Sequence, residues 1–202
     1  DLAAYDRVYG EGYQRVNRRF AETLAPLIQP DDVIWVHDYH LIPLARELRI
    51  LGVKNRIGFF LHIPWPAHQV FTTLPGHARL VEAMFDYDLV GFQTTEYLQA
   101  FEEYVIAEAG GSQPTPATLK AHNRILRVGA FPIGLDAVEF ARMLKSPRAR
   151  RMRDLMTAST VFRYLVVGVD RLDYSKGLEE RFIGFERFLA DNPQMRRQVL
   201  ML

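Results

Sequence analysis

The sequence predicts an α/β protein built on parallel sheets, and three observations support this prediction. Apolar runs at residues 33–36 and 57–61 are short, rich in β-branched or aromatic residues, and bounded by turn residues, as buried parallel strands are. A helical stripe with short connections lies between these runs, which favours a strand–helix–strand unit. The alternation of strand and helix returns after about residue 160, so we expect a second parallel sheet there.

The first elements follow from apolar spacing and stop signals. A helix is expected over about residues 12–28, where apolar side chains recur at helical spacing before Pro30. The strand at 33–36 leads into a helix whose leucine stripe, at positions 41, 44, 48 and 51, ends at Gly52. The next strand covers 56–61 and ends in a turn bracketed by Pro64 and Pro66.

Further along the chain, residues 67–85 have a helical pattern and residues 87–92 have the pattern of a third strand. Thr94 or Thr95 is expected to cap a helix that ends near Ala109. Residues 110–122 are rich in Gly, Pro, Ser and Thr, which predicts a long loop. A strand at 125–131 then ends at the tight turn formed by residues 132–134.

The composition changes between Arg142 and Arg153, where six basic residues occur without an acidic one. This run favours the solvated face of a linking helix over an anion-binding patch. We therefore predict a linking helix and a domain boundary near residues 135–160. The second domain is expected to contain a strand at 164–169, a helix at 178–190 and a strand at 199–202.

Composition narrows the functional classes. The net charge of +1 gives no global attraction to nucleic acid, and the absence of cysteine excludes thiolate metal sites and fits a cytoplasmic protein. No apolar run is long enough to cross a membrane, so no membrane partner is expected. The sequence leaves room for a homo-oligomer. It begins without Met and stops inside an apolar run, which predicts a piece of a longer protein.

Polar residues cluster where the first two strands end. His37, Asp38 and His40 follow the strand at 33–36, and His62 follows the strand at 56–61. Ligands bind at the carboxyl ends of strands in open α/β sheets, so these residues are candidates for a binding site. For Asp38, the pattern allows a helix cap, a hydrogen bond to a substrate hydroxyl, or a metal ligand. The spacing of the histidines does not favour the metal.

A second candidate site lies in the segment from residue 166 to Gly177. Arg171 and Lys176 follow a buried strand and precede the amino end of a helix, where backbone N–H groups and the helix dipole attract anions. The spacing alone equally allows both cations to pair with Asp170 or Asp173 on the surface. The segment lacks the glycine and lysine spacing of a Walker loop.

Five segments together resemble the trehalose-6-phosphate synthase family, the retaining glycosyltransferases of family 20. They are VIWVHDYHLIPLARELR, NRIGFFLHIPWP, YDLVGFQT, VGAFPIG and GVDRLDYSKGLEERF. Their order and spacing run from about Tyr13 to the end of the chain, except for residues 110–122. The resemblance implies a GT-B fold of two Rossmann-like domains. This chain would hold the C-terminal part of the first domain at 1–138, a linking helix at 139–160 and the start of the second domain at 161–202.

The resemblance also implies a reaction and its residues. Glucose would pass with retention from UDP-glucose to glucose 6-phosphate, giving trehalose 6-phosphate and UDP, without a metal or other cofactor. Asp38 and Tyr39 resemble the residues that bind glucose 6-phosphate, and His62 and Ile63 resemble those at the donor glucose. Arg171 and Lys176 resemble the pair that holds the donor diphosphate.

Two alternatives stay open at this point. One is a related synthase with another acceptor, such as a glucosylglycerol-phosphate or validoxylamine-phosphate synthase. The other is a non-catalytic, sugar-phosphate-sensing domain that has kept the fold. Several family residues for donor and acceptor lie outside the matched segments, so the isolated chain is expected to be inactive or nearly so.

Overall fold

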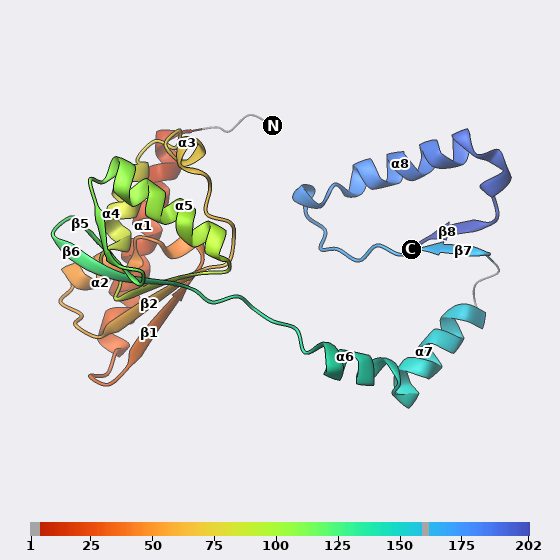
Figure 1. The fold of residues 1–202 in the computed structure, drawn as a ribbon, viewed down its shortest axis with the longest axis horizontal. Coiled ribbons are helices and arrows are strands. Elements are labelled where there is room, and N and C mark those ends of the chain that lie inside the picture. Colours follow the sequence, from red (N-terminus) through yellow and green to blue (C-terminus); the bar gives the residue numbers. More distant parts are fainter. Residues whose placement is uncertain (1–4, 159–161) are drawn as a thin grey trace. The chain divides into compact units, whose positions relative to one another are not determined.

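The structure is a computed structural model that describes residues 5–158 and 162–202. Its chain divides into two compact units, unit 1 (Asp1–Gly134) and unit 2 (Leu135–Leu202), each of which is described by itself (Figure 1). Both units contain parallel strands, which confirms the predicted α/β class. Within the described residues, no helix is long and apolar enough to span a membrane.

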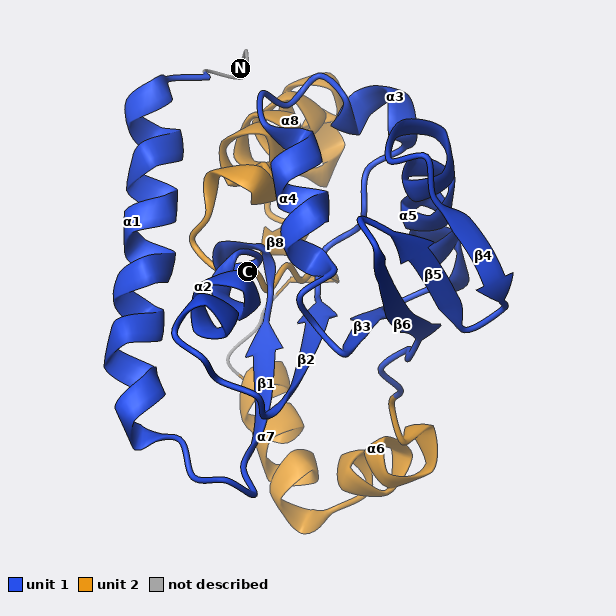
Figure 2. Ribbon diagram, turned by 90° about the vertical axis from the view of Figure 1, so that its left-hand side faces the viewer, with its two compact units in different colours: residues 1–134 blue, residues 135–202 orange. Residues whose placement is uncertain are grey.

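Unit 1 is built on a six-stranded sheet in the order β1-β2-β3-β6-β5-β4 (Figure 2). The strands β1 (Val33–His37), β2 (Arg56–Leu61), β3 (Leu89–Phe92) and β6 (Arg124–Ala130) are parallel to one another. Their β-branched and aromatic side chains suit this pairing, which places all four carboxyl ends at one edge. The strands β5 (Thr118–Ala121) and β4 (Ser112–Thr115) extend the sheet in antiparallel fashion.

The core of unit 1 lies on one face of this sheet. Ile57, Phe59 and Leu61 are at most 2% exposed, whereas Trp35 on the other face is 67% exposed. Figure 2 shows the helices α1, α2 and α4 alongside the strands. The elements that complete the core face are α1 (Arg7–Leu24), η1 (Ala25–Leu27), η2 (Tyr39–Leu41), α2 (Leu44–Ile50), α3 (His68–Phe71), α4 (His77–Met84) and α5 (Thr95–Glu108). The strands of this part are therefore buried on one face, not on both as expected for parallel strands.

A buried carboxylate ties three parts of unit 1 together at the end of the sheet where β2 and β6 begin. Asp86 is 4% exposed and lies in the turn between α4 and β3. Its carboxylate pairs with Arg46 of α2, at 2.9 Å, and with Arg124 of β6. Arg49 of α2 donates to the backbone oxygen of Asp86 at 3.3 Å. Because an unpaired buried charge is costly, these pairs hold α2 and β6 to the turn.

Three predicted elements of unit 1 differ from the structure. Residues 110–122 form β4 and β5 instead of a loop, because His122 and Asn123 adopt φ values of 49° and 59° and close a two-residue hairpin onto β6. The helix predicted over 67–85 is two helices, since Pro75 and the left-handed Gly76 interrupt it. The first helix begins earlier than predicted, because the Asp6 side chain caps it.

Other predictions agree closely with the structure. Thr94 caps α5 by accepting a hydrogen bond from the backbone N–H of Tyr97. The helix α2 ends at Ile50 with Leu51 as its cap, directly before Gly52, which has a φ of 86°. The strand predicted at 87–92 begins at Leu89, and the strand at 125–131 is β6.

Unit 2 begins with two helices where one linking helix was predicted over 139–160. They are α6 (Ala137–Leu144) and α7 (Pro147–Ala158), separated because Pro147 disfavours helical geometry at the preceding residue. Residues 159–161 of that prediction lie outside the described residues. The rest of the unit comprises β7 (Tyr164–Val166), η3 (Tyr174–Lys176), α8 (Leu178–Asp191), η4 (Pro193–Met195) and β8 (Val199–Met201), with β7 and β8 paired in parallel.

The pairs around Asp86 predict a large cost for its removal. Asp86→Ala leaves Arg46 and Arg124 without their common partner and is expected to lower the free energy of unfolding by about 3 kcal/mol. Urea denaturation measures this change. Glu11→Ala serves as the matched control, because the Arg7–Glu11 pair is mostly solvated and should contribute only about 0.5 kcal/mol. Equal losses in the two variants would contradict the structural role of Asp86.

Candidate functional site

The polar residues that follow β1 and β2 lie at one edge of the sheet, as predicted. β1 ends at His37, which is in register with Phe60 of β2, and β2 ends one residue before His62. The backbone N–H of Asp38 donates to the Phe60 oxygen at 2.8 Å, so the ladder continues past the strand. The edge therefore presents Asp38 and Tyr39 from one strand beside His62 and Ile63 from the next.

Asp38 has a backbone conformation that is rare for a residue with a side chain. Its φ is 68° and its ψ is 166°, a region that glycine occupies almost alone. The side chain lowers part of this cost, because Oδ1 accepts a hydrogen bond from the Tyr39 N–H at 3.0 Å. Asp38 thus caps the 3-10 turn η2, one of the roles that the sequence left open. Such strain persists only where the surroundings enforce it.

Three side chains enforce the turn by hydrogen bonding its consecutive carbonyl groups. Tyr13 Oη donates to the oxygen of Tyr39 at 2.6 Å, and Asn17 Nδ2 donates to that of His40 at 3.1 Å. The hydroxyl of Tyr87 donates to the oxygen of Leu41 at 2.8 Å. We call these three residues the carbonyl clamp. They come from α1 and from the segment before β3, so helix and sheet together position Asp38.

Burial raises the pKa of both tyrosines in the carbonyl clamp. Asn17 is 0% exposed and Tyr87 is 2% exposed. Burial raises the pKa of Tyr13 and the pKa of Tyr87 above the ordinary tyrosine value, because the phenolate would lose its hydration. Both hydroxyl groups are therefore held in the neutral form that can donate to a carbonyl.

The sequence interpretation missed the carbonyl clamp. The apolar spacing that predicts the first helix includes Tyr13, and the sequence pattern gives no role to Asn17 or Tyr87. One signal was available, since Asn17 lies four residues after Tyr13 and therefore on the same face of the helix. An amide on a core-facing stripe needs a polar partner in the interior.

Most of the candidate residues of unit 1 line two grooves. Tyr39 and Ile63 line a groove of about 380 Å³ that also contains Tyr13, which we call the Tyr39 groove. His62 and His37 line a second groove of about 480 Å³ on the exposed face of the sheet, which we call the Trp35 groove. Asp38 is not a lining residue of either groove, within the part of the chain that the structure describes.

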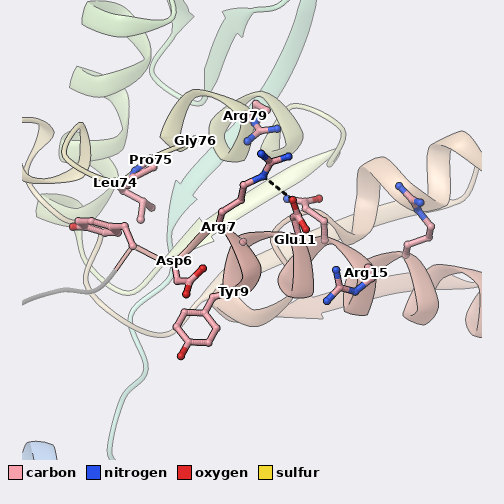
Figure 3. A pocket seen from close by; sticks show the side chains of 13 residues that line it. Asp6, Arg7, Tyr9, Glu11, Arg15, Leu74, Pro75, Gly76 and Arg79 are labelled. Atoms are coloured by element: carbon pink, nitrogen blue, oxygen red, sulfur yellow. Dashed lines mark hydrogen bonds and ion pairs between the residues drawn. The ribbon is translucent and has the colours of Figure 1, made fainter.

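The Tyr39 groove adjoins a wider, arginine-rich hollow at the start of α1. Figure 3 shows Arg7, Arg15 and Arg79 among its side chains, with Arg7 paired to Glu11. The two hollows share several residues, among them Gly10 and Arg79.

Trp65, the aromatic residue of the HIPWP turn, has a packing role. It is 4% exposed and contacts Phe71 and Phe101.

The histidines at the strand ends contact other rings. Among residues 5–158 and 162–202, no group of three or more His, Asp or Glu side chains converges in a way that would hold a metal ion. His37 contacts His62 instead, and the His40 ring stacks on Tyr39 with ring centroids 3.9 Å apart.

In unit 2, Arg171 and Lys176 flank the turn that starts α8. Lys176 ends η3, directly before Gly177, whose φ of 59° lets the chain turn into α8. The predicted surface partners are engaged elsewhere. Asp170 pairs with Arg181 at 2.5 Å, and Asp173 accepts from the N–H and the hydroxyl of Ser175.

Arg171 and Lys176 therefore remain available for a ligand. The backbone N–H of Ser175 holds the pKa of Asp173 below its usual value, so this carboxylate stays ionised within its own turn. Within the described ranges of the chain, neither Arg171 nor Lys176 forms an ion pair with a carboxylate. Exposed cations beside a helix amino end suit an anionic ligand such as a phosphate.

Comparison with known proteins adds independent findings. The model of the family described as glycosyltransferase family 20 matches residues 2–202. A trehalose-6-phosphate synthase from Sinorhizobium fredii is 48% identical over 202 residues, which is 100% of this chain and 44% of that protein. A trehalose-6-phosphate synthase from Klebsiella pneumoniae is 44% identical over 198 residues, which is 96% of this chain and 41% of that protein.

The chain is also similar to solved structures of trehalose-6-phosphate synthases. An alpha,alpha-trehalose-phosphate synthase (UDP-forming) from Burkholderia xenovorans, in complex with glucose-6-phosphate, has a TM-score of 0.86 and 50% identity over 100% of this chain and 45% of that one. An Escherichia coli trehalose-6-phosphate structure bound with UDP-2-fluoro glucose has a TM-score of 0.81 and 40% identity, covering 100% and 44%. The chain thus spans less than half the length of these relatives.

The strained backbone of Asp38 predicts an unusual order of stability among its variants. Asp38→Gly and Asp38→Ala both lose the cap, but only glycine adopts the observed φ and ψ without strain. The free energy of unfolding of the glycine variant is expected to be about 1 to 3 kcal/mol higher than that of the alanine variant. Urea denaturation of the two variants measures the difference, and an alanine variant as stable as the glycine variant would contradict the strain.

The raised pKa of Tyr87 predicts a loss of stability at alkaline pH. Above about pH 10 the unfolded chain releases the tyrosine proton while the folded chain keeps it, so the unfolded state binds fewer protons. The free energy of unfolding then falls by about 1.4 kcal/mol per pH unit for this group. Tyr87→Phe removes this contribution and is expected to flatten the alkaline slope, measured by urea denaturation between about pH 9 and pH 11.

A matched control for this prediction is Tyr9→Phe, because the Tyr9 side chain is 70% exposed. It should keep the alkaline slope of the parent protein. If the Tyr87→Phe and Tyr9→Phe variants lose stability with the same slope, the buried hydroxyl of Tyr87 is not the group responsible.

Proposed function

The chain belongs to glycosyltransferase family 20, and we propose on that basis that the protein it comes from is a UDP-forming trehalose-6-phosphate synthase. It would transfer glucose from UDP-glucose to glucose 6-phosphate with retention of configuration. The ligands bound in two similar structures, glucose-6-phosphate and UDP-2-fluoro glucose, support this choice of acceptor and donor. The identity of 50% to the Burkholderia xenovorans synthase extends over 100% of this chain.

One observation of the structure carries the proposal, namely the arrangement of Arg171 and Lys176 at the start of α8. A UDP leaving group develops negative charge as the bond to glucose breaks. Two cations and the N–H groups of a helix amino end are suited to stabilise that charge. Asp170 pairs with Arg181, and Asp173 accepts hydrogen bonds from Ser175, so within the described residues neither carboxylate forms an ion pair with Arg171 or Lys176. Asp173 keeps its negative charge near both cations, which help to lower its pKa.

Unit 1 would supply the groups that orient the two sugars. We assign Asp38 and Tyr39 to the acceptor glucose 6-phosphate, and His62 and Ile63 to the glucose of the donor. Tyr39 and Ile63 line the same groove, which brings one residue of each pair together. The carbonyl clamp would keep Asp38 in its strained conformation, so that its position does not depend on a bound sugar.

The proposed reaction balances without a cofactor. The bond from the glucose C1 atom to the β-phosphate oxygen of UDP breaks, and a bond from C1 to the anomeric oxygen of glucose 6-phosphate forms on the same face. The departing phosphate oxygen takes the proton of the acceptor hydroxyl. Arg171 and Lys176 would provide the positive charge that a metal ion supplies in other enzymes, so we propose no metal site.

The setting of the reaction follows from the same proposal. Both substrates are soluble sugar phosphates, and the cysteine-free sequence is compatible with the reducing cytoplasm, where we expect the protein to act. We propose that residues 1–138 belong to the acceptor side, residues 139–160 link the two sides, and residues 161–202 start the nucleotide-sugar side.

The test uses the protein at the full length of its relatives, incubated with UDP-glucose and glucose 6-phosphate. We expect release of UDP together with trehalose 6-phosphate, detected by coupled assay and mass spectrometry. Arg171→Ala and Lys176→Ala are each expected to lower turnover by about 30- to 1,000-fold, the equivalent of about 2 to 4 kcal/mol of transition-state stabilisation. Arg187→Ala, on the solvated side of α8, is the control and should keep full turnover.

The outcomes separate the reaction from the assigned roles. No UDP release with glucose 6-phosphate would overturn the proposed function. UDP release that survives in the Arg171→Ala and Lys176→Ala variants would overturn their role at the leaving group. Asp38→Ala is expected to raise the KM for glucose 6-phosphate, whereas a change in thermal stability alone would leave Asp38 only its capping role.

A further inference from the structure

His37 makes a direct side-chain contact with His62, the residue assigned above to the donor glucose. The distance from His37 Nδ1 to His62 Nε2 is 2.9 Å, a normal hydrogen-bond length. The two rings are also close to parallel, with an interplanar angle of 28° and centroids 5.2 Å apart. The function proposed above gives no task to His37.

We propose that His37 is a positioning residue that fixes the ring plane and the tautomer of His62, so that His62 presents its Nδ1 atom to the glucose of the donor. The proposal rests on the proposed function, because it takes the role of His62 from there. It adds a residue and an atomic assignment that the comparisons do not contain.

The sheet imposes this contact. His37 is the last residue of β1 and is in register with Phe60, two residues before His62. Because successive side chains point to opposite faces, Trp35, His37, Phe60 and His62 share one face of the sheet. All four line the Trp35 groove. The backbone bond from the Asp38 N–H to the Phe60 oxygen, at 2.8 Å, keeps the two strand ends together just below the rings.

Neighbouring rings hold the pair from both sides. The Trp35 ring lies against His37 with centroids 4.7 Å apart, and the Phe60 ring meets His62 nearly edge-on at 4.8 Å. These contacts restrict rotation of each imidazole about its bond to Cβ. A ring held in this way has one nitrogen directed at its partner and the other free to meet a ligand.

The hydrogen bond also determines which atom of His62 is free. Only one of the two facing nitrogens can carry the proton, so the contact requires a fixed tautomer relationship between the rings. Since Nε2 of His62 is engaged with His37, Nδ1 is the ring atom left for a sugar hydroxyl. For histidines that bind a metal, removing the group that orients the ring through its second nitrogen costs about 10- to 100-fold, and we expect an effect of the same order here.

Stability alone does not account for His37. Its side chain is exposed, and the buried core of unit 1 lies on the opposite face of the sheet. Loss of its hydrogen bond would therefore leave no buried polar atom without a partner. A defect confined to use of the donor would thus come from the orientation of His62.

Three variants of the full-length protein test the proposal. His37→Phe keeps a flat ring against Trp35 but removes the nitrogen, and kcat/KM for UDP-glucose is expected to fall about 10- to 100-fold. The KM for glucose 6-phosphate should stay within about twofold of the parent value. His37→Asn places an amide close to the former Nδ1 position and should recover most of the loss. Val33→Ala, at a position of β1 that is 72% exposed and lines neither groove, is the matched control and should behave like the parent protein.

Nitrogen NMR of histidine-labelled protein provides a readout that a purely structural role would not move. At about pH 8, above the range where histidine ordinarily titrates, the ring nitrogens of His62 should report one dominant tautomer in the parent protein and in His37→Asn. In His37→Phe they should report a changed mixture. Val33→Ala should retain the parent spectrum at His62.

The experiments distinguish failure of the proposed function from failure of the positioning role of His37. If the parent protein releases no UDP, the proposed function fails, and the NMR comparison then decides the contact between the histidines by itself. If the parent is active and His37→Phe keeps its kinetics with UDP-glucose, the positioning role is overturned. Identical His62 ring signals in the parent and His37→Phe proteins overturn it as well.

Discussion

The parallel hydrogen-bond ladder between β1 and β2 is the constraint on which the site of unit 1 depends. It puts the carboxyl ends of both strands at one edge, and the bond from Asp38 to the Phe60 oxygen extends the pairing beyond β1. Without this register, His37 would not face His62 and Tyr39 would not share a groove with Ile63. A slip of one residue would move every side chain of β1 to the other face. Positioning of the site and stability of the sheet therefore have the same physical origin.

The strain at Asp38 shows how the interior supports that edge. An aspartate in a glycine-like conformation is costly, yet the carbonyl clamp satisfies the three carbonyl groups that follow it. Two clamp residues come from α1, and the third precedes β3, so distant segments must pack before the turn is stable. The polar groups of the turn are bonded from the buried side. The edge thus combines a rigid support with side chains that reach solvent.

Several features of the fold were predictable from local patterns, and others were not. Strand–helix–strand alternation and the cap at Thr94 depend on nearby residues, and both appear as predicted. The composition of residues 110–122 indicated a loop, but the hairpin closed by His122 and Asn123 gains its stability by pairing with β6. Pro75 and Gly76 were sufficient to predict the break between α3 and α4, and the apolar periodicity concealed it. The roles of Asp38, His62, Arg171 and Lys176 came from the family resemblance and remain predictions.

Local sequence alone is enough to establish the α/β class, most of the strands and helices, and the family, because these depend on residue types at short spacing. It also identifies Asp38 and His62 as polar residues at strand ends. The contact between His37 and His62, the carbonyl clamp and the pairs around Asp86 join residues 23 to 46 positions apart in the chain. Such partners come together only when the sheet forms and α1 packs on it. Hydrogen bonding is directional and short in range, so nothing in the linear order of residues reveals which of them will meet.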